Sequence, residues 1–206
     1  MRIERLENSK RKQERVLVYL EDGSILRITG AELLQFGLYQ GLDLPPEALA
    51  ALEAAARRSD TKRRGANMAA GRMLSKKELT SRLTRKGASP EDAADTADWL
   101  EELGAVDDAA YAGAIARHYG AMGCGAGRVR QELHRRGVPK ELWDEALAQL
   151  PPPEEAIRKF LRTKLRGRPL PPEDSRRMAA ALQRRGFSWQ DIRPALNELG
   201  QEIDEA

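Results

Sequence analysis

Leu133-His134-Arg135-Arg136-Gly137 lies in the second half of the chain, and its pattern occurs twice more, at residues 83–87 and 182–186. Each copy has a leucine, a polar residue, two basic residues and a glycine, and the glycines are 50 and 49 residues apart. Basic residues followed by glycine are typical of a helix C-terminus, because cations favour the negative end of the helix dipole and glycine readily adopts the left-handed conformation of the cap. The three copies therefore predict three helices that end at Gly87, Gly137 and Gly186.

A second helix is expected after each of these glycines. Apolar residues recur six, ten and thirteen positions beyond the glycine, namely Ala93, Ala97 and Leu100, then Trp143, Leu147 and Leu150, and finally Ile192, Leu196 and Leu199. Spacings of four and three residues place such side chains on one face of a helix. Two residues after each glycine stands a residue suited to opening a helix, Ser89, Pro139 or Ser188.

A third helix is predicted ahead of each pair, over Thr61–Met73, Asp108–Tyr119 and Glu154–Leu165. Ser75 and Glu78 form a capping-box pattern at the start of the helix that ends at Gly87. We therefore expect a mainly α fold, in which three tandem three-helix repeats, residues 59–106, 107–150 and 151–206, form an elongated body. A repeat of this size depends on its neighbours for stability.

The first 58 residues differ from the rest because they carry strand signals. The runs Val16–Leu20 and Ser24–Ile28 are rich in β-branched and other strand-forming residues, and Asp22-Gly23 between them is a strong hairpin signal. A third short strand is expected over Arg2–Leu6. Residues 1–58 are therefore predicted to form a small β-hairpin with accompanying helices.

Two helices are expected to complete this N-terminal part. Thr29 and Glu32 form a capping-box pattern at the start of the first helix, and Gly37 indicates its end. Pro45-Pro46 opens the second helix, which is predicted to run through Ala56.

The composition predicts a soluble helical protein with small cores. Apolar residues make up 41% of the 206 residues but aromatic residues only 5%, so the cores are expected to consist mostly of Leu, Ala and Val. The N-terminus is charged from its second residue without an apolar run behind it, and no stretch approaches the ~20 apolar residues of a membrane span. A cytoplasmic location is therefore expected, with no signal peptide and no membrane segment.

Residues that commonly bind metals or perform catalysis are scarce. Cys124 is the single cysteine and His118 and His134 are the two histidines, which excludes an intramolecular disulfide and a cysteine zinc site. Nothing in the sequence orients a Cys124–His118 pair, so an inert thiol is the favoured interpretation. Because no base, nucleophile and orienting group occur together, we expect neither an enzyme nor a cofactor.

Three other motifs have both a structural and a chemical interpretation. The glycine-rich stretch Gly120–Gly127 lacks the Gly-Lys-Ser/Thr ending of a phosphate loop, which favours a flexible connection that frees the helix beginning near Arg128. Asp107-Asp108 precedes a predicted helix, which favours an N-terminal cap over a metal-binding or acid–base pair. Five aromatic residues could stack on nucleic-acid bases, but their helical spacing is more typical of core residues. They are Tyr111, Trp143, Phe160, Phe187 and Trp189.

Basic residues are the strongest candidates for a binding surface. The net charge of +3 does not by itself indicate nucleic acid, but residues 111–206 carry the positive excess. The basic pairs recur at the same helix end in each repeat. The helix dipole alone would favour cations there, yet stacked repeats would also align these pairs along one edge of the protein. The candidate residues for contact with a partner or with DNA are Arg72, Arg85, Lys86, Arg128, Arg130, Arg135, Arg136, Arg158, Arg162, Lys164, Arg184 and Arg185. Such an edge suits an acidic protein surface or a DNA backbone, and either contact weakens with salt.

Four blocks of residues follow one another in a fixed order. They are Arg72-x-x-Ser75-x-x-Glu78-Leu79 with Lys86-Gly87; Leu103-Gly104-x-x-Asp107-Asp108-x-x-Tyr111-Ala112; Gly125-x-x-Arg128-Val129-Arg130-Gln131-Glu132-Leu133 with Arg136-Gly137-Val138; and Arg185-Gly186-Phe187-Ser188 with Ile192 and Leu196. Over residues 60–200, in order and spacing, these blocks resemble the RecX family, which modulates the RecA recombinase. Their combination is more specific than any single block.

That resemblance implies a curved helical protein that lies in the groove of the RecA–single-stranded-DNA filament. There it would restrain ATP hydrolysis, strand exchange and co-protease activity, and so act in recombination, DNA repair and the SOS response. The implied partner is the RecA filament, with single-stranded DNA as a second candidate.

The alternative is a helical repeat module that binds DNA or RNA directly, without a recombinase partner. Binding to naked single-stranded DNA at physiological salt separates the two hypotheses, because only the direct module is expected to bind it tightly with a steep salt dependence. In either case a monomer is expected, since the basic residues are scattered and few apolar residues would be exposed.

Overall fold

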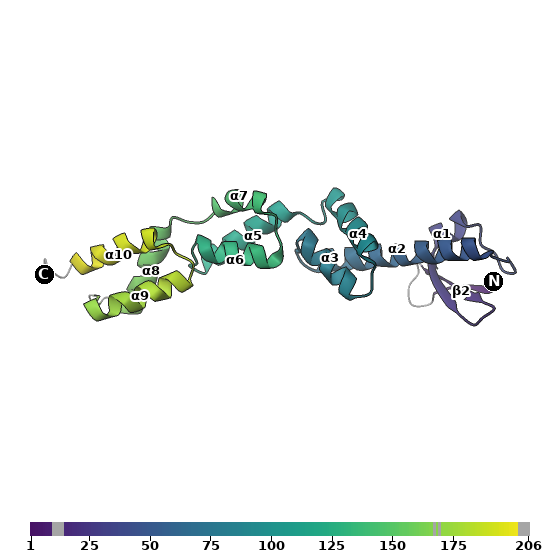
Figure 1. Cartoon of the computed structure of the whole chain (residues 1–206), viewed down its shortest axis with the longest axis horizontal. Helices are drawn as coiled ribbons and strands as arrows, with labels where there is room; N and C mark the ends of the chain where they lie inside the picture. The colour runs from purple at the N-terminus through teal and green to yellow at the C-terminus, as the bar shows by residue number, and fades with distance from the viewer. Residues whose placement is uncertain (10–14, 167, 169, 202–206) are drawn as a thin grey trace. The chain divides into compact units, whose positions relative to one another are not determined.

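The chain forms two compact units (Figure 1). The computed structural model describes residues 1–9, 15–166, 168 and 170–201, and the side chains of residues 172 and 199–201 lie outside that description. One unit consists of residues 1–72 and 79–105, and the other of residues 73–78 and the described residues from 106 onward.

The first unit begins with a three-stranded antiparallel sheet in the order β1-β2-β3. Its strands are β1 (Ile3–Asn8), β2 (Arg15–Leu20) and β3 (Ile25–Thr29). In the β2–β3 turn, Gly23 has a φ of +81° and the Asp22 carboxylate accepts a hydrogen bond of 2.9 Å from the Ser24 N–H. These are the properties that suit Asp-Gly to a hairpin turn. The predicted hairpin and the predicted third strand are both confirmed.

Helix α1 (Gly30–Gln35) follows the sheet and has the predicted capping box. The Glu32 N–H donates to the Thr29 hydroxyl at 3.2 Å, and the Thr29 N–H donates to the Glu32 carboxylate at 2.6 Å. Alternate residues of β2 point to one buried face, where Val18 and Leu20 share a core with Leu52 of the next helix. The period of two along the strand thus sets the face that packs on a helix.

Helix α2 runs without interruption over Pro46–Gly71, a length of 26 residues. The prediction of one helix ending near Ala56 and another beginning at Thr61 is therefore wrong. No glycine or proline separates the two segments, and the hydroxyls of Ser59 and Thr61 donate to carbonyls of the preceding turn at 3.1 and 2.9 Å. These side chains bond along the helix instead of ending it. The boundary predicted between residues 58 and 59 consequently falls inside a helix.

The end of α2 packs against α4 (Pro90–Glu102), which follows α3 (Lys76–Arg85). The two helices approach closely at Gly65, where a Cβ atom would lie only 2.6 Å from the Thr96 methyl carbon. The predicted apolar face of α4 is buried, as are the apolar residues of α3, and these side chains are Leu79, Leu83, Ala93, Ala97 and Leu100.

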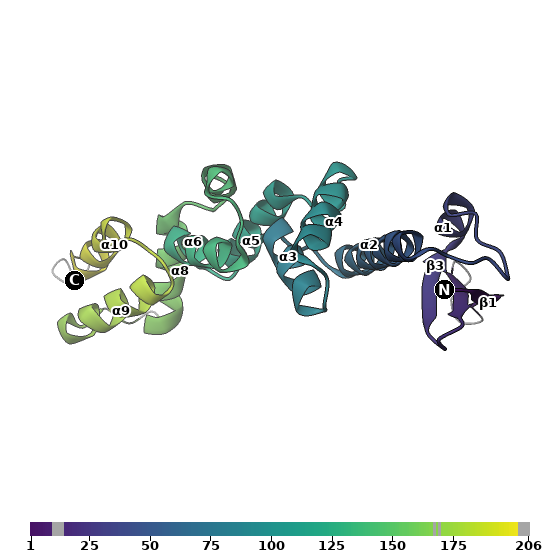
Figure 2. The ribbon, with the colours of Figure 1, turned by 45° about the vertical axis from the view of Figure 1, so that its right-hand side comes forward.

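The second unit contains two helical triplets (Figures 1 and 2). The first consists of α5 (Asp108–Ala121), α6 (Ala126–Arg136) and a 3-10 turn, Lys140–Leu142, that continues into α7 (Trp143–Leu147). The second consists of α8 (Pro153–Leu165), α9 (Pro172–Arg184) and α10 (Trp189–Gln201). Each triplet has its own core, one around Ile115 and Leu133 and the other around Leu161 and Leu182. The mainly α fold is confirmed.

The three glycines that define the repeat all adopt the predicted left-handed conformation. Their φ angles are +90° at Gly87, +69° at Gly137 and +89° at Gly186. The helix after Gly137 is shorter than the helices after Gly87 and Gly186. A proline run begins at Pro151, shortly after the end of this helix, and a proline disfavours the helical conformation of the residue before it. Of the helix-face residues predicted from the spacing, Leu199 has a side chain outside the described part of the chain.

Four of the five aromatic residues singled out in the sequence belong to the cores, as expected from their spacing. Tyr111, Phe160 and Phe187 are buried, and the half-buried Trp143 donates its indole N–H to the Val138 carbonyl at 3.1 Å. Trp189 is the exception, since 53% of it is exposed at the start of α10.

Candidate functional site

The glycine-rich stretch before α6 is a docking surface for the turn between α9 and α10. The Gly125 N–H donates to the Arg185 carbonyl and the Gly127 N–H donates to the Gly186 carbonyl, both at 2.9 Å. Side chains have no room there, because a Cβ on Gly125 would lie 2.6 Å from the Gly186 oxygen, and one on Gly186 would lie 2.1 Å from the Arg128 nitrogen. The prediction of a flexible connection is therefore wrong. The two N–H groups are occupied by carbonyls of the chain itself and do not form a phosphate loop.

A matching junction lies at Ser75, immediately before α3. The Ser75 hydroxyl donates to the Arg136 carbonyl at the end of α6 and accepts the Glu78 N–H at 3.0 Å, which confirms the predicted cap. The Gly137 turn packs on the same segment, since a Cβ on Gly137 would lie 2.4 Å from the Lys77 Cδ. In both junctions the carbonyl end of one helix meets the donor end of another, which satisfies groups that helix termini leave unpaired.

The two aspartates before α5 have different partners. The Asp107 carboxylate accepts the Ala110 N–H at 2.8 Å, so the predicted N-terminal cap is confirmed. Asp108 is buried and accepts the Lys76 N–H at 2.9 Å, which adds a further hydrogen bond to the junction at Ser75.

Glu132 is a buried carboxylate that binds two of the predicted site residues. It accepts hydrogen bonds from the Nε atoms of Arg135 and Arg136 at 3.1 and 2.7 Å. The hydrogen bond from Arg135 lowers the pKa of Glu132 to about 2, with help from Arg136 and in spite of burial. Arg136 also donates to the Tyr111 hydroxyl, which in turn donates to the Glu78 carboxylate at 3.0 Å. Arg136 is therefore part of a buried network, and Arg135 shares its carboxylate.

A hollow of about 1160 Å³ lies beside α8 in the second unit. Its walls are the segment Gly120–Gly123, the prolines before α8, and α8 itself. Arg185 lines this hollow and is fixed in place, because its guanidinium donates to the carbonyls of Met122 and Gly123 at 3.2 Å each. The same guanidinium lies 4.8 Å from the centre of the Phe160 ring, a cation–π distance.

Helix α8 has a basic face along this hollow because its apolar residues turn inward. Ile157, Phe160 and Leu161 are buried. The exposed residues of α8 that line the hollow are acidic in the first turn, at Glu154 and Glu155, neutral at Thr163, and otherwise basic, at Arg158, Lys159, Arg162 and Lys164. Helical spacing thus separates the core face from a charged face on one short element.

The charges on this face differ in how strongly they are already engaged. Arg158 forms an ion pair of 2.9 Å with Glu198 of α10, and both side chains are more than half exposed. Lys164 lies 6.0 Å from the centre of the Phe160 ring, whereas Lys159 and Arg162 have neither an ion-pair partner nor a ring contact among the described residues. They are therefore the cations of this hollow most readily available to an anionic partner.

The structure divides the twelve predicted site residues into three groups. Those at the hollow beside α8 are Arg158, Arg162, Lys164 and Arg185. Those bound to Glu132 are Arg135 and Arg136. Those exposed near helix ends or on other helices are Arg72, Arg85, Lys86, Arg128, Arg130 and Arg184.

The candidate list from sequence omits Lys159, a basic residue of the third repeat that lies on the same exposed face of α8 as Arg158 and Arg162. A helical projection of Pro153–Leu165 would have found it, since the three side chains lie at exposed helical positions. It also missed Glu132 as the partner of the central basic pair. That acid stands three and four residues before the two arginines, the spacing at which helical ion pairs form.

Other kinds of site find little support in the described part of the chain. No three His, Cys, Asp or Glu side chains among the described residues are grouped so that they could hold a metal ion. Within the same residues, every helix is too short or too polar to cross a membrane.

Two family models match the chain. One describes the second three-helix domain of RecX and matches residues 107–147, which contain α5, α6 and α7. The other describes the third three-helix domain of RecX and matches residues 153–196, which correspond to α8, α9 and most of α10. Both junction glycines of the second unit, Gly137 and Gly186, lie within these ranges.

Curated proteins and solved structures agree with these matches. The regulatory protein RecX of Chlorobaculum tepidum is 33% identical over 139 residues, which cover 65% of this chain and 84% of that protein. The regulatory protein RecX of Lactobacillus delbrueckii subsp. bulgaricus is 29% identical over 211 residues, or 96% of this chain and 75% of that protein. A crystal structure of a regulatory protein RecX has a TM-score of 0.75 at 23% identity and covers 96% of this chain and 98% of its own, so the two share a fold.

Proposed function

The chain belongs to the RecX family, and on that premise we propose that it binds the filament that a RecA recombinase forms on single-stranded DNA. Bound there, it restrains ATP hydrolysis, strand exchange and co-protease activity, and so acts in recombination, DNA repair and the SOS response. It does so as a non-enzymatic cytoplasmic monomer. The observation that supports this proposal most is the group of basic residues along the hollow beside α8, since this helix lies in the range that the third-domain model matches.

The proposed contact uses the exposed cations of α8, with Lys159 and Arg162 as its centre. Because these two side chains have no ion-pair partner among the described residues, binding an anion breaks no existing ion pair. Three other exposed cations of the same unit extend the proposed surface, namely Arg128 and Arg130 of α6 and Arg184 at the end of α9. Such a contact speeds association and weakens with salt, whether it meets an acidic protein surface or phosphates.

Three of the predicted site residues act in this proposal by positioning other groups. Arg136 binds the buried Glu132, Arg135 binds the same carboxylate, and Arg185 holds the Gly120–Gly123 segment. Removing any of them would alter the shape of the second unit as well as its charge. They are therefore poor probes of the contact itself.

The proposal is tested with filaments assembled on a fluorescently labelled oligonucleotide, to which the chain is added at several salt concentrations. The double variant Lys159→Glu/Arg162→Glu should bind at least about tenfold more weakly, a change of ~1.4 kcal/mol. The matched control is Arg176→Glu/Arg177→Glu on α9, which makes the same charge change at two exposed positions outside the hollow. Equal losses in the two variants would contradict a contact on α8.

A module that binds DNA or RNA directly remains the second candidate, and Trp189 supports it. This side chain is 53% exposed and, with Arg193, lines a second hollow of about 470 Å³ on α10. An exposed indole beside a guanidinium can stack on a nucleic-acid base. Tight binding to naked single-stranded DNA, with no preference for the filament, would favour this candidate over the regulator.

A further inference from the structure

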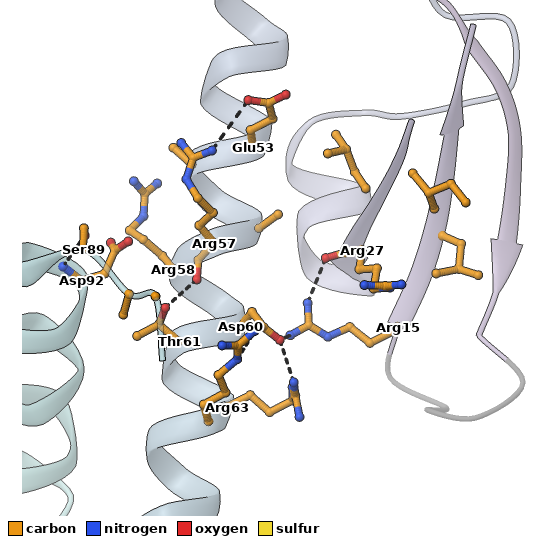
Figure 3. Close-up of a pocket in the computed structure, with 18 of the residues that line it drawn as sticks. Arg15, Arg27, Glu53, Arg57, Arg58, Asp60, Thr61, Arg63, Ser89 and Asp92 are labelled. Atoms are coloured by element: carbon orange, nitrogen blue, oxygen red, sulfur yellow. Dashed lines mark hydrogen bonds and ion pairs between the residues drawn. The ribbon is translucent and has the colours of Figure 1, made fainter. Parts of the chain in front are cut away.

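A separate hollow, in the first unit, gathers arginines from distant parts of the chain (Figure 3). It has a volume of about 1200 Å³ and is lined by the sheet, by α2 and by the turn from α3 to α4. Its basic residues are Arg15 and Arg27 from the sheet and Arg57, Arg58, Arg63 and Arg64 from α2. All of them lie outside the matched domain ranges, residues 107–147 and 153–196.

Asp60 of α2 is shared by three of these arginines. Its carboxylate lies 3.4 Å from the nearest nitrogen of Arg15, 2.6 Å from that of Arg63 and 2.6 Å from that of Arg64. Burial opposes ionisation of this carboxyl, but the hydrogen bond from Arg63 and the neighbouring charges outweigh it and lower the pKa of Asp60. One carboxylate cannot neutralise three guanidiniums. Glu53, Glu91 and Asp92 also line the hollow, and its six arginines exceed its four carboxylates by two charges.

The cluster is held in place by the protein itself. Figure 3 shows Arg15 reaching from the sheet to Asp60, and this side chain is only 7% exposed. It also donates to the Arg27 carbonyl at 3.1 Å and to the Ser59 hydroxyl at 3.3 Å. Arg64 donates to the Lys86 carbonyl at 3.0 Å, where the turn from α3 to α4 begins. Because these guanidiniums are already ordered, a ligand would lose little side-chain entropy by binding them.

Other donors of the hollow remain available. Arg27 and Arg58 are exposed and have no ion-pair partner among the described residues. Glu53 is engaged by Arg57 at 3.7 Å. The arginines of this hollow thus offer more hydrogen-bond donors than its own carboxylates use.

We propose that this hollow binds the phosphodiester backbone of single-stranded nucleic acid. Guanidiniums bind phosphate oxygens through paired hydrogen bonds, and a single strand supplies one phosphate at every nucleotide for a dense arginine cluster. The described lining residues include no aromatic side chain on which a base could stack, so we expect binding to be independent of base sequence. This inference goes beyond the proposed function, which places the filament contact on α8.

The test uses the full chain and a fluorescein-labelled oligo-thymidylate, with anisotropy measured over a range of salt concentrations. Arg27→Ala/Arg58→Ala should weaken binding about tenfold, and the slope of log affinity against log salt should fall by about 1.4, for two lost phosphate contacts. The matched control, Arg176→Ala/Arg177→Ala, removes two exposed arginines from α9 and should leave both quantities nearly unchanged. An abasic strand of the same length should bind within about threefold of oligo-thymidylate, because no stacking is lost.

If both double variants lose the same affinity for the oligonucleotide, the effect is due to net charge alone, and the proposed site is overturned. Poly-glutamate is added as a competitor at the same concentration of negative charge as the oligonucleotide. If it displaces the oligonucleotide, and if this displacement also requires Arg27 and Arg58, the hollow is assigned to an acidic protein segment instead. Displacement by inorganic phosphate alone would assign it to free phosphate. Filament binding by the α8 variant is measured separately, so failure here leaves the proposed function untouched. Unfolding curves should be the same for wild type and Arg27→Ala/Arg58→Ala, since both side chains are exposed.

Discussion

Replacing Gly186 by alanine tests whether docking of the α9–α10 turn on α6 holds the last helical triplet in place. The chain supplies a close control, since Gly87 has a φ of +90° against +89° at Gly186. A Cβ on Gly87 would meet no atom within 4 Å, whereas a Cβ on Gly186 would lie 2.1 Å from the Arg128 nitrogen. The two substitutions therefore share the cost of a left-handed alanine and differ in the loss of the junction.

The difference in unfolding free energy follows from the contacts. Gly87→Ala should cost about 1–2 kcal/mol, the penalty for a side chain in the left-handed region. Gly186→Ala adds the loss of two backbone hydrogen bonds, each worth about 0.5–1.5 kcal/mol. Its expected total is about 2–5 kcal/mol, before any gain from relaxation around Arg128.

The assay is urea denaturation followed by circular dichroism, combined with hydrogen exchange read by mass spectrometry. Gly186→Ala should lose protection in α8–α10 and at the start of α6, where the Gly125 and Gly127 N–H groups are bonded to the turn. Gly87→Ala should lose protection only around its own turn. If both variants lose the same free energy, or if exchange in α8–α10 is unchanged in Gly186→Ala, the docking interpretation is refuted.

Three further substitutions give independent checks. The pKa of Glu132 is about 2, below its ordinary value of 4.5. The stabilisation that its ionised carboxylate gives the folded state is therefore complete above pH 4.5 and is lost as pH falls toward 2. Glu132→Gln should therefore lower the unfolding free energy at neutral pH by about 3 kcal/mol and flatten acid unfolding between those values; parallel acid curves for variant and wild type would contradict this. Gly65→Ala should cost about 1–3 kcal/mol in urea denaturation because its Cβ would lie 2.6 Å from Thr96, whereas Gly71→Ala, with open space, should not destabilise. Trp189→Ala should leave thermal unfolding nearly unchanged, and it should weaken binding to naked single-stranded DNA only if the direct DNA-binding module is correct.

Local signals in the sequence predicted most of the secondary structure. Asp22-Gly23 has the expected turn geometry, and the Thr29–Glu32 capping box is present. Each of these features depends on residues at most a few positions apart, so a short segment of sequence contains all the interactions that form it. The break predicted between two helices near residue 58 failed because a lapse in apolar periodicity does not end a helix when no breaker is present.

The candidate sites depended on contacts that a short stretch of sequence does not contain. Arg15 reaches Asp60, 45 residues away, and the pocket around that pair could not be foreseen from either neighbourhood. The glycines at 125 and 127 were interpreted from their composition, but their partner is the turn at Gly186, far along the chain. Two basic pairs with the same sequence pattern likewise have different partners, since Arg136 is bound to a buried acid, whereas Arg185 at the equivalent position donates to the carbonyls of Met122 and Gly123.

Filament regulation is tested most directly by RecA-catalysed, single-stranded-DNA-dependent ATP hydrolysis with this protein titrated into the reaction. Regulation through the filament predicts that hydrolysis falls at fewer than one chain per recombinase monomer, and that Lys159→Glu/Arg162→Glu requires more protein for the same effect than Arg176→Glu/Arg177→Glu does. Unchanged hydrolysis at a stoichiometric excess of the wild-type chain would contradict it.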